Sequence, residues 1–344
     1  MLQYLKFPVL SLVLGLVVAG LLSWFQHPNL VLALQAMLTV LLLCILEISL
    51  SFDNAVVNAT VLRKMDPVWR KRFLFWGMLI AVFGMRLFFP ILIVAVAGNL
   101  TVADAFLLAI KEPKLYSQMM SEAHLAVSSF GGTFLLMVSL SFFLDSAKEN
   151  HWISVIEKTF GRLGKIKGAE FIFVLTVLLT IYPQLDFESQ ATFIKSSLYG
   201  LLTYLCVHGF SELLGDESLK TIKWLSSGLG LFLYLEVLDA SFSFDGVIGA
   251  FAITTQIFEI MIGLGVGAFF VRGLTLYLVE HEKLEEYEFL EHGAFYALFV
   301  LAFFMLLDHF YHFSEWLTAL SGAAILFLSI WYSIHERNKQ KKKL

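Results

Sequence analysis

The chain has 344 residues, of which 58% are hydrophobic and only 15% are charged, with a formal net charge of −4. Soluble domains carry about 25% charged residues, so this composition, with a mean hydropathy of +0.79, excludes an ordinary soluble domain. The small net charge gives no sign of a nucleic-acid partner. The two cysteines lie in apolar runs and predict neither a disulfide framework nor a thiolate metal site; they are Cys44 and Cys206.

Apolar runs of about 20 residues, the length that a helix needs to cross a bilayer, recur along the chain. The sequence therefore predicts an all-α, polytopic helical membrane protein with about ten transmembrane helices. The predicted spans cover residues 7–25, 30–60, 73–97, 125–144, 169–182, 193–214, 222–251, 257–279, 294–310 and 316–334. Lys6 precedes the first run as in a signal peptide, but no small-x-small cleavage site follows, so we expect this helix to stay.

The second predicted span and two intervening segments depart from simple apolar helices. Residues 30–60 would form a helix about 45 Å long, longer than the ~30 Å hydrocarbon core, so this span must tilt, protrude or break. Residues 99–123 are more polar and predict a partly interfacial hairpin. Residues 148–167 interleave apolar and basic side chains, which predicts an amphipathic interfacial linker helix.

The distribution of basic residues predicts the topology. Lys and Arg cluster after the second, fourth and tenth spans, more weakly after the sixth, and are scarce after the first, fifth, seventh and ninth. By the positive-inside rule, this alternation fits ten spans with both termini cytoplasmic, in a multi-pass protein of the inner (cytoplasmic) membrane. We expect one membrane domain built from an N-terminal repeat, residues 1–167, and a C-terminal repeat, residues 168–344, which ends in a Lys-rich cytoplasmic tail.

Two similar acidic motifs interrupt the apolar runs. Residues 47–54 read Glu-Ile-Ser-Leu-Ser-Phe-Asp-Asn and residues 239–246 read Asp-Ala-Ser-Phe-Ser-Phe-Asp-Gly, which indicates an internal repeat. Each copy is followed by a Gly nine residues before an Arg: Gly77 and Arg86, then Gly263 and Arg272. The motif-bearing second and seventh spans are five spans apart, so they would cross the membrane in opposite directions. Such an inverted repeat is typical of secondary transporters.

Acidic side chains at membrane depth point to a function. On insertion scales each costs roughly 2.5–3.5 kcal/mol near the bilayer centre, and this chain has five: Glu47, Asp53, Glu236, Asp239 and Asp245. Carboxylate, amide and hydroxyl oxygens suit Mg²⁺, Ca²⁺ or Mn²⁺ rather than Zn²⁺ or Cu⁺. We therefore expect a divalent metal ion as substrate and no organic cofactor. The expected direct ligands are Glu47, Asp53, Asp239 and Asp245, with Asn54, Ser51 and Ser243 as auxiliary ligands.

The spacing inside each motif leaves two arrangements open. Glu47 and Asp53 would lie ~120° apart around a straight helix and ~9 Å apart along it, so they cannot both face one small ion. Either the helix unwinds at residues 51–53, or each motif contributes its acids to a site shared with the other. Unwound segments that free backbone carbonyls for an ion are a known transporter solution.

Other polar residues are expected to balance charge or carry protons. Arg86 and Arg272 are candidates to pair with the acids and release them when an ion arrives, and Glu236 is expected to tune the charge. The alternative role for the arginines is a fixed ion pair that orients the acids. His208 and Glu212 form an i, i+4 pair that could relay protons or only satisfy each other.

The first motif resembles a known family. Its pattern Glu47-x-x-Leu50-Ser51-x-Asp53-Asn54, with a second Asp-bearing copy late in the chain, is similar to the TerC/Alx-like integral membrane proteins, in a longer branch of that group. The resemblance implies membrane metal-ion homeostasis, above all manganese export, with a link to tellurite resistance. The ion-site residues that this resemblance would assign to the chain are Glu47, Asp53, Asn54, Asp239 and Asp245. The chain departs from that pattern in its length, in Glu236 and in its amphipathic linker.

The function expected from these features is secondary transport, as an exporter, of a divalent cation such as Mn²⁺ or Ca²⁺. No nucleotide-binding motif is present to couple ATP within this chain, and no enzymatic activity is expected. The expected partners are the metal ion, protons and the lipid bilayer, with a homo-oligomer left open. One alternative is an intramembrane aspartyl hydrolase, although its Gly-x-Gly-Asp pattern is absent. The other is a membrane subunit of a metal or tellurite stress-resistance complex, with structural acids.

Overall fold

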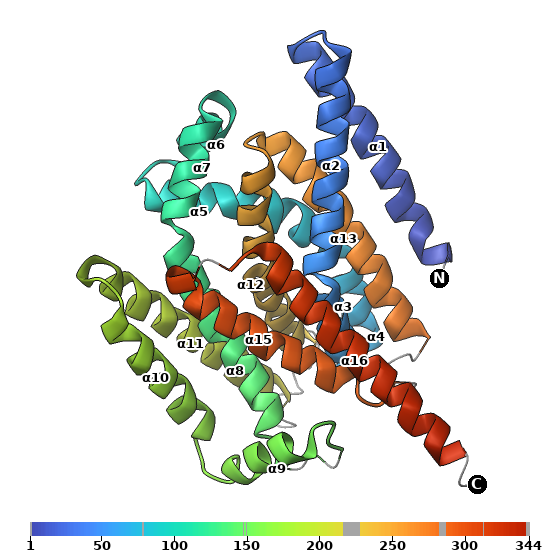
Figure 1. The fold of residues 1–344 in the computed structure, drawn as a ribbon, viewed down its shortest axis with the longest axis vertical. Coiled ribbons are helices and arrows are strands. Elements are labelled where there is room, and N and C mark those ends of the chain that lie inside the picture. The colour runs from blue at the N-terminus through green and yellow to red at the C-terminus, as the bar shows by residue number, and fades with distance from the viewer. Residues whose placement is uncertain are drawn as a thin grey trace. The chain divides into compact units, whose positions relative to one another are not determined.

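The computed structural model describes residues 2–77, 79–146, 148, 150–215, 228–281, 287–311 and 313–341. Within its helices, it describes the backbone but not the side chains of Glu212 and Asp245. These residues form helices joined by turns and loops, which confirms the all-α prediction (Figure 1).

The helices follow one another along the chain as follows: α1 (Leu2–Gln26), α2 (Leu30–Leu50), α3 (Phe52–Lys64), α4 (Pro67–Arg72), η1 (Phe73–Gly77), η2 (Ile80–Phe88), α5 (Phe89–Ala97), α6 (Val102–Lys111), α7 (Pro113–Glu122), α8 (His124–Phe143), α9 (Ser154–Leu163), α10 (Ala169–Ile181), η3 (Tyr182–Gln184), α11 (Phe187–Gly215), α12 (Leu229–Ile253), α13 (Ile257–Glu280), α15 (Leu290–Tyr311) and α16 (Glu315–Lys341). The η1 and η2 segments are π-helical, and η3 is a 3₁₀ turn.

Six helical segments within the described residues are long and apolar enough to cross a membrane, and they confirm a multi-pass helical membrane protein. They are Tyr4–Gln26, Leu30–Leu50, Pro67–Ala97, His124–Phe143, Ile257–Glu280 and Leu290–Tyr311. These segments match the first, third, fourth, eighth and ninth predicted spans, whereas the second, predicted over residues 30–60, ends at Leu50. The other four predicted spans fall on α10, α11, α12 and α16, and residues 222–227 of the seventh lie outside the described residues. The α12 helix carries three acids along its length. The total of ten spans and the inverted repeat stay predictions.

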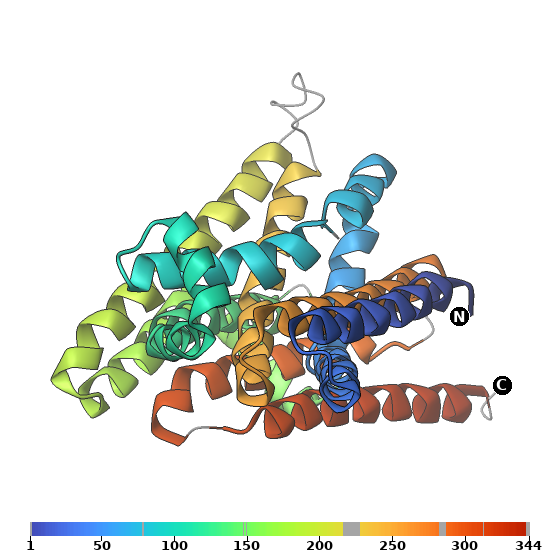
Figure 2. The same cartoon turned by 90° about the horizontal axis from the view of Figure 1, so that it is seen from above.

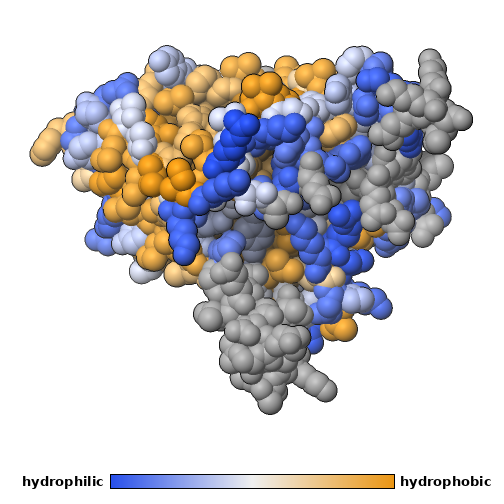
Figure 3. Space-filling view, turned by 90° about the horizontal axis from the view of Figure 1, so that it is seen from below, coloured by the Kyte–Doolittle hydropathy of each residue, from blue (hydrophilic) through white to orange (hydrophobic). Residues whose placement is uncertain are grey.

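Exposed apolar side chains agree with a lipid environment. On α1, Phe7, Leu10 and Leu14 are all more than half exposed, and Figure 3 shows hydrophobic side chains gathered over a broad area of the surface. Apolar surface in water costs about 25 cal/mol per Å², whereas lipid tails are as apolar as these side chains. A bilayer therefore accommodates surface that water would not.

The chain divides into two compact units. Unit 1 contains Met1–Ala55, Asp66–His124 and Phe242–Tyr277, and unit 2 contains Val56–Met65, Leu125–Ser241 and Leu278–Leu344. Two helices contribute to both units: α3 changes unit after Ala55, and α12 changes unit after Ser241. The first acidic motif thus ends in a helix that contributes to both units, and the second lies in another such helix.

In unit 1, α1 packs beside both α2 and α13. A short turn joins α1 to α2, and Asn29 caps α2 by accepting a hydrogen bond from the Val31 N–H at 2.9 Å. The α1 and α13 helices run antiparallel, because Tyr4 contacts Tyr277 and Phe7 contacts Phe269 (Figure 2). These edge-to-face aromatic pairs are typical of close helix packing.

The α2 helix also packs against α13 and against the second half of α12. Leu43 and Leu46 of α2 form a buried cluster with Val247 and Ala250 of α12. A Cβ added at Gly263 of α13 would lie 2.5 Å from the Leu43 Cβ, so this glycine permits the close approach of the two helices. The core of unit 1 therefore lies directly beside the first acidic motif.

In unit 2, small residues let α8 approach α15. A Cβ added at Gly132 would lie 2.9 Å from the Leu306 Cγ and 3.1 Å from the Ala302 oxygen. Phe142 of α8 also stacks on Phe295 of α15, with ring centroids 4.0 Å apart. Close backbone approach at small residues is the usual device for packing membrane helices.

The predicted amphipathic linker includes the short helix α9, which has one feature that the pattern did not indicate. Val155 is exposed, as expected for an interfacial helix, but Glu157 is only 2% exposed. One oxygen of Glu157 accepts hydrogen bonds from the N–H groups of Trp152 and Ile153, at 3.1 and 3.2 Å. This carboxylate therefore fixes the turn into α9.

The other oxygen of Glu157 faces three basic side chains from two segments. It lies 3.1 Å from Lys148 Nζ, 3.6 Å from His151 Nδ1 and 3.4 Å from His292 Nε2. Burial lowers the pKa of Lys148 from its ordinary value, although Glu157 partly opposes that shift. The cluster ties α9 and the loop before it to the first turn of α15.

We predict that Glu157→Gln destabilises the folded protein by about 3–5 kcal/mol, because Lys148 then keeps a buried charge without its counter-ion. Unfolding in mixed detergent and dodecyl sulfate, followed by circular dichroism, would measure this loss. The matched control is Glu122→Gln, since Glu122 is exposed and surface changes usually stay within about 0.5 kcal/mol. Equal stability of the two variants would contradict the assigned role of Glu157.

Candidate functional site

The first acid of the first motif, Glu47, is buried and already paired. It lies in the last turn of α2 with 1% exposure. Its Oε1 accepts a hydrogen bond of 2.8 Å from the Ser51 hydroxyl, four residues later on the same helix face. The same oxygen accepts a hydrogen bond from the Arg86 guanidinium and forms a buried ion pair with it. The prediction that an arginine of the repeat pairs with a motif acid holds for Arg86.

An unusual backbone presents Arg86 to this carboxylate. Residues 80–88 form the π-helix η2, whose wider turns are shown by the bond from the Phe89 N–H to the Gly84 oxygen. The Arg86 guanidinium also donates to the Ala81 oxygen at the start of the same segment. Long π-helical segments are rare and occur frequently at functional sites. The amino-acid pattern of these residues does not indicate a π-helix.

Two glycines leave the space that the Glu47 side chain occupies. A Cβ added at Gly267 of α13 would lie 2.5 Å from the Glu47 Cβ, and one added at Gly246 of α12 would lie 3.2 Å from the Glu47 Oε2. Gly246 is the last residue of the second motif. Residues of both motifs therefore meet at Glu47 within unit 1.

The two motif helices differ in regularity. The α2 helix ends at Leu50, and Ser51 has φ −103° and ψ 16°, but its N–H still bonds to the Glu47 oxygen at 2.9 Å. The Ala55 N–H bonds to the Ser51 oxygen at 3.1 Å, so the interruption is confined to one residue. The second motif lies in the continuous helix α12. Unwinding over residues 51–53 is therefore not what the structure has, because backbone bonds bridge the break.

Asp53 and two neutral ligand candidates are also buried in unit 1. Asp53 is 7% exposed and accepts a hydrogen bond from the Asn54 N–H at 2.9 Å. Among the described residues, neither the Asn54 Oδ1 nor the Ser243 Oγ has a hydrogen-bond partner, although both atoms are buried. Buried polar atoms without a partner are uncommon and call for an explanation, such as an ion or water.

In unit 2, Asp239 is held by a residue that sequence reasoning missed. The Asn58 amide donates a hydrogen bond of 2.8 Å to the Asp239 Oδ1, and both side chains are buried. Asn58 is one helical turn after Asn54, and this i, i+4 spacing of amides is the signal that could have identified it. Glu236 is buried on the same helix as Asp239.

Two of the remaining candidates contact aromatic residues, and the side chains of two others are not described. Arg272 donates a hydrogen bond to the Phe73 oxygen and lies 4.2 Å from the Phe73 ring centroid, so its described contacts tie α13 to the π-helical η1. His208 stacks on Tyr204, with ring centroids 5.4 Å apart. The side chains of Glu212 and Asp245 lie outside the described set, so the His208–Glu212 pair and the Asp245 ligand stay predictions.

A comparison with families of known proteins identifies the chain's relatives. A family model described as "Protein of unknown function (DUF475)" matches residues 52–341. The chain belongs to the DUF475 family. The matched range includes Asp53, Arg86 and all of α12, whereas α1, α2 and Glu47 precede it. No curated protein and no solved structure matches the chain. The likeness to the TerC/Alx-like proteins therefore stays a hypothesis.

Metal binding by this DUF475 protein would need neutral oxygen ligands as well as carboxylates. Within the described part of the chain, no three His, Cys, Asp or Glu side chains lie close enough to hold a metal ion. The side chain of Asp245 is not in that set. Any site around Glu47 would therefore combine carboxylates with hydroxyl and amide oxygens, as Ca²⁺ and Mg²⁺ sites commonly do.

We predict that Gly267→Ala destabilises the DUF475 protein by about 1–3 kcal/mol, the usual cost of overpacking, because the added methyl meets Glu47 and the Cys44 oxygen. Gly265→Ala on the same helix is the matched control, since its nearest atom is a Val82 methyl at 3.3 Å that can shift. Thermal unfolding in detergent would compare the two. A Gly267→Ala protein as stable as the control would show that α13 does not press on Glu47.

We also predict strong coupling between Glu47 and Arg86. Glu47→Gln and Arg86→Gln should each cost about 3–5 kcal/mol, since each leaves the other charge buried. The double variant should cost clearly less than the sum, because no unpaired charge remains. A double-mutant cycle of unfolding free energies would measure this, and additive losses would exclude a direct pair.

Proposed function

We propose that this DUF475 protein is a secondary transporter that exports a divalent metal cation, with Mn²⁺ or Ca²⁺ as the expected ion. The observation that carries the proposal is the meeting of the two motifs at Glu47. Gly246 of the second motif approaches one oxygen of Glu47, while Arg86 and Ser51 bond to the other. At membrane depth, one oxygen of Glu47 thus holds Arg86, while the other faces the second motif. Such a carboxylate is suited to exchange the fixed guanidinium of Arg86 for a mobile metal ion.

The directions of the helices support an inverted repeat. In unit 1, Gly246 approaches Glu47 and Ala250 packs with Leu43, so the second half of α12 runs antiparallel to α2. This is the relation expected if the two motif spans enter the membrane from opposite sides. We propose ten spans in this arrangement, with both termini cytoplasmic.

The proposed ion site combines three carboxylates of unit 1 with neutral oxygens. Glu47, Asp53 and Asp245 would supply charge, and the neutral oxygens would come from Asn54, Ser51 and Ser243. The buried, unpartnered Asn54 and Ser243 oxygens support this set. Ca²⁺ takes six to eight oxygen ligands at about 2.3–2.6 Å, so neutral ligands are as necessary as charged ones.

Arg86 is proposed to act as a resident cation. When no metal is bound, its charge balances Glu47 and limits the cost of a buried carboxylate. An arriving divalent ion would compete with it for the same oxygens, and Arg86 would turn back to the Ala81 oxygen that it already contacts. Asp239 and Glu236, on the half of α12 that belongs to unit 2, are proposed as a further ligand and as a tuner of charge and proton coupling.

A second candidate is a purely structural role for the acids, as in a membrane subunit of a stress-resistance complex. The specific observations that favour it are the Glu47–Arg86 ion pair and the Asn58–Asp239 hydrogen bond, because each satisfies an acid without a metal. The two functions differ in what Asp53→Asn does, since Asp53 is not part of the Glu47–Arg86 ion pair: it stops transport in one case and weakens folding in the other.

The test is metal flux into proteoliposomes, compared for Mn²⁺, Ca²⁺, Mg²⁺ and Zn²⁺. Asp53→Asn is expected to lower the flux at least tenfold while the protein remains folded by gel filtration, because it removes a ligand charge and keeps the side-chain shape. Glu122→Gln, an exposed acid, is the control. Absence of flux above empty liposomes for all four ions would refute transport, and unfolding of Asp53→Asn would favour the structural role.

A further inference from the structure

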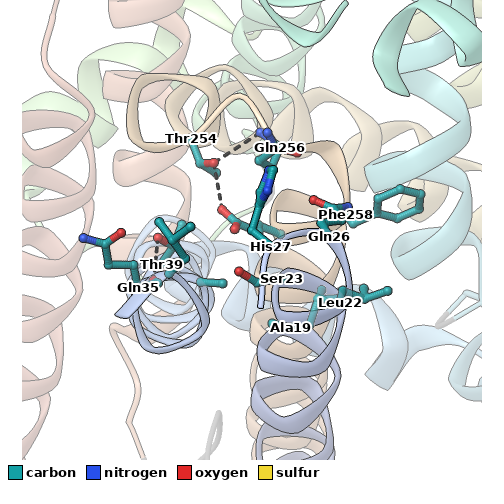
Figure 4. Close-up of a pocket in the computed structure, with 14 residues that line it drawn as sticks. Ala19, Leu22, Ser23, Gln26, His27, Gln35, Thr39, Thr254, Gln256 and Phe258 are labelled. Atoms are coloured by element: carbon teal, nitrogen blue, oxygen red, sulfur yellow. Dashed lines mark hydrogen bonds between the residues drawn. The ribbon is translucent and has the colours of Figure 1, made fainter. Parts of the chain in front are cut away.

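A polar pocket of about 290 Å³ lies in unit 1, at the end of α2 away from Glu47. Figure 4 shows Ser23 of α1 and Thr39 of α2 near it, with Thr254 and Gln256 of the α12–α13 turn at its end. The pocket is lined by carbonyl, amide and hydroxyl groups as well as apolar side chains. None of these residues belongs to the acidic motifs.

Glu259 supplies a carboxylate to this lining. It lies in the first turn of α13, and its Oε2 accepts a hydrogen bond of 2.8 Å from the Thr254 hydroxyl. That hydroxyl in turn accepts a hydrogen bond of 3.2 Å from the Gln256 N–H, so the position of the carboxylate is fixed. The described lining residues include neither Lys nor Arg, and their one histidine is His27 in the α1–α2 turn.

The negative charge of Glu259 determines which sign of charge a ligand of this pocket would carry. The helices α1 and α12 end at the pocket, and α2 and α13 begin there, so two negative and two positive helix-dipole ends offset each other. The carboxylate then makes the pocket attractive to cations. Its carboxylate, amide and hydroxyl oxygens are the ligands that hard ions take.

The volume is sufficient for a hydrated ion. Water occupies about 30 Å³ per molecule in the liquid, so the pocket of about 290 Å³ has room for roughly ten water molecules, whereas a hexahydrated ion needs about six. Small divalent cations give up their water reluctantly and commonly keep several molecules when bound. Amides and hydroxyls can hydrogen-bond to such water molecules, as Gln35, Thr39 and Ser23 are placed to do.

The pocket lies one helical turn before the seam of α2 and α13 that leads to Glu47. The helices α2 and α13 run parallel, because Leu43 faces Gly263 and Glu47 faces Gly267. One turn earlier in the same register, Thr39 and Glu259 line the pocket. Thr39 is thus ~12 Å along the helix from Glu47.

An apolar layer closes the seam between the pocket and Glu47. Leu43, Ile260 and Leu264 are fully or almost fully buried and belong to one cluster. An ion in the pocket therefore does not reach Glu47 without movement of these side chains.

We infer that this pocket binds a hydrated divalent cation at Glu259, on the side of the membrane where the α1–α2 and α12–α13 turns lie; its place on the transport route rests on the proposed function. The ion is held in its water shell outside the apolar layer and exchanges with the Glu47 site when that layer opens. Glu259 attracts the cation, and the surrounding amides and hydroxyls bind its water.

The test uses Mn²⁺ alone and a single cysteine in the pocket. Gln35→Cys is introduced after Cys44→Ala and Cys206→Ala, and its reaction with a charged, membrane-impermeant methanethiosulfonate is timed at rising Mn²⁺. Mn²⁺ is expected to slow the labelling at least threefold with Glu259 present and not to slow it in Glu259→Gln. Gln keeps an oxygen that can accept the Thr254 hydrogen bond, so folding is expected to survive.

Two controls complete the experiment. Glu280→Gln alters an acid at the other end of α13, ~31 Å away, and should keep the full protection. Glu259→Asp keeps the charge and should retain protection at higher Mn²⁺, which separates charge from folding. Labelling that ignores Mn²⁺ in the parent, or equal protection in Glu259→Gln, overturns the inference.

Metal flux of the same parent protein distinguishes the two proposals. Flux without protection of Gln35→Cys refutes the pocket alone. Protection without flux leaves Glu259 as a cation site and refutes transport.

Discussion

The buried ion pair between Glu47 and Arg86 is the constraint on which unit 1 depends. A carboxylate within an apolar helix is tolerable only if its charge and its hydrogen bonds are both satisfied. Arg86 and Ser51 satisfy one oxygen. This requires a helix that brings Arg86 to that point, which is the π-helical η2, and it requires glycines where α12 and α13 pass the side chain. The unusual backbone and the glycines thus have one common cause.

The two motifs are similar in sequence but not in their surroundings. In the first, Arg86 pairs with an acid, whereas Arg272, its counterpart after the second, bonds to the Phe73 backbone and stacks on its ring. The first motif contains a break at Ser51, and the second lies in an unbroken helix. Arg86 therefore balances the charge of Glu47, and the described contacts of Arg272 join α13 to η1.

The sequence predicted what local pattern determines. Apolar run length identified the all-α membrane fold, and the repeated motifs identified Glu47 and Arg86 as candidate site residues. It missed features that depend on distant partners. Asn58 is an ordinary helical amide until Asp239 lies opposite it, and Glu157 resembles a solvated charge on an amphipathic helix until Lys148 and His292 surround it. The π-helical conformation of η2 was also missed, since its apolar residues are equally compatible with an ordinary α-helix.

The parallel register of α2 and α13 connects the pocket, the apolar layer and the ion pair. Leu43 of α2 faces Gly263 of α13 in the layer, and Glu47 faces Gly267 at the ion pair. One turn earlier on both helices, Thr39 and Glu259 line the pocket. Because Gly263 and Gly267 have no side chains, Leu43 and Glu47 lie directly against the α13 backbone. A movement of α13 against α2 would therefore disturb the layer and the environment of Glu47 together. The glycines that allow Glu47 to be buried thus also couple the proposed opening of the seam to the ion pair, because the same close contacts hold both.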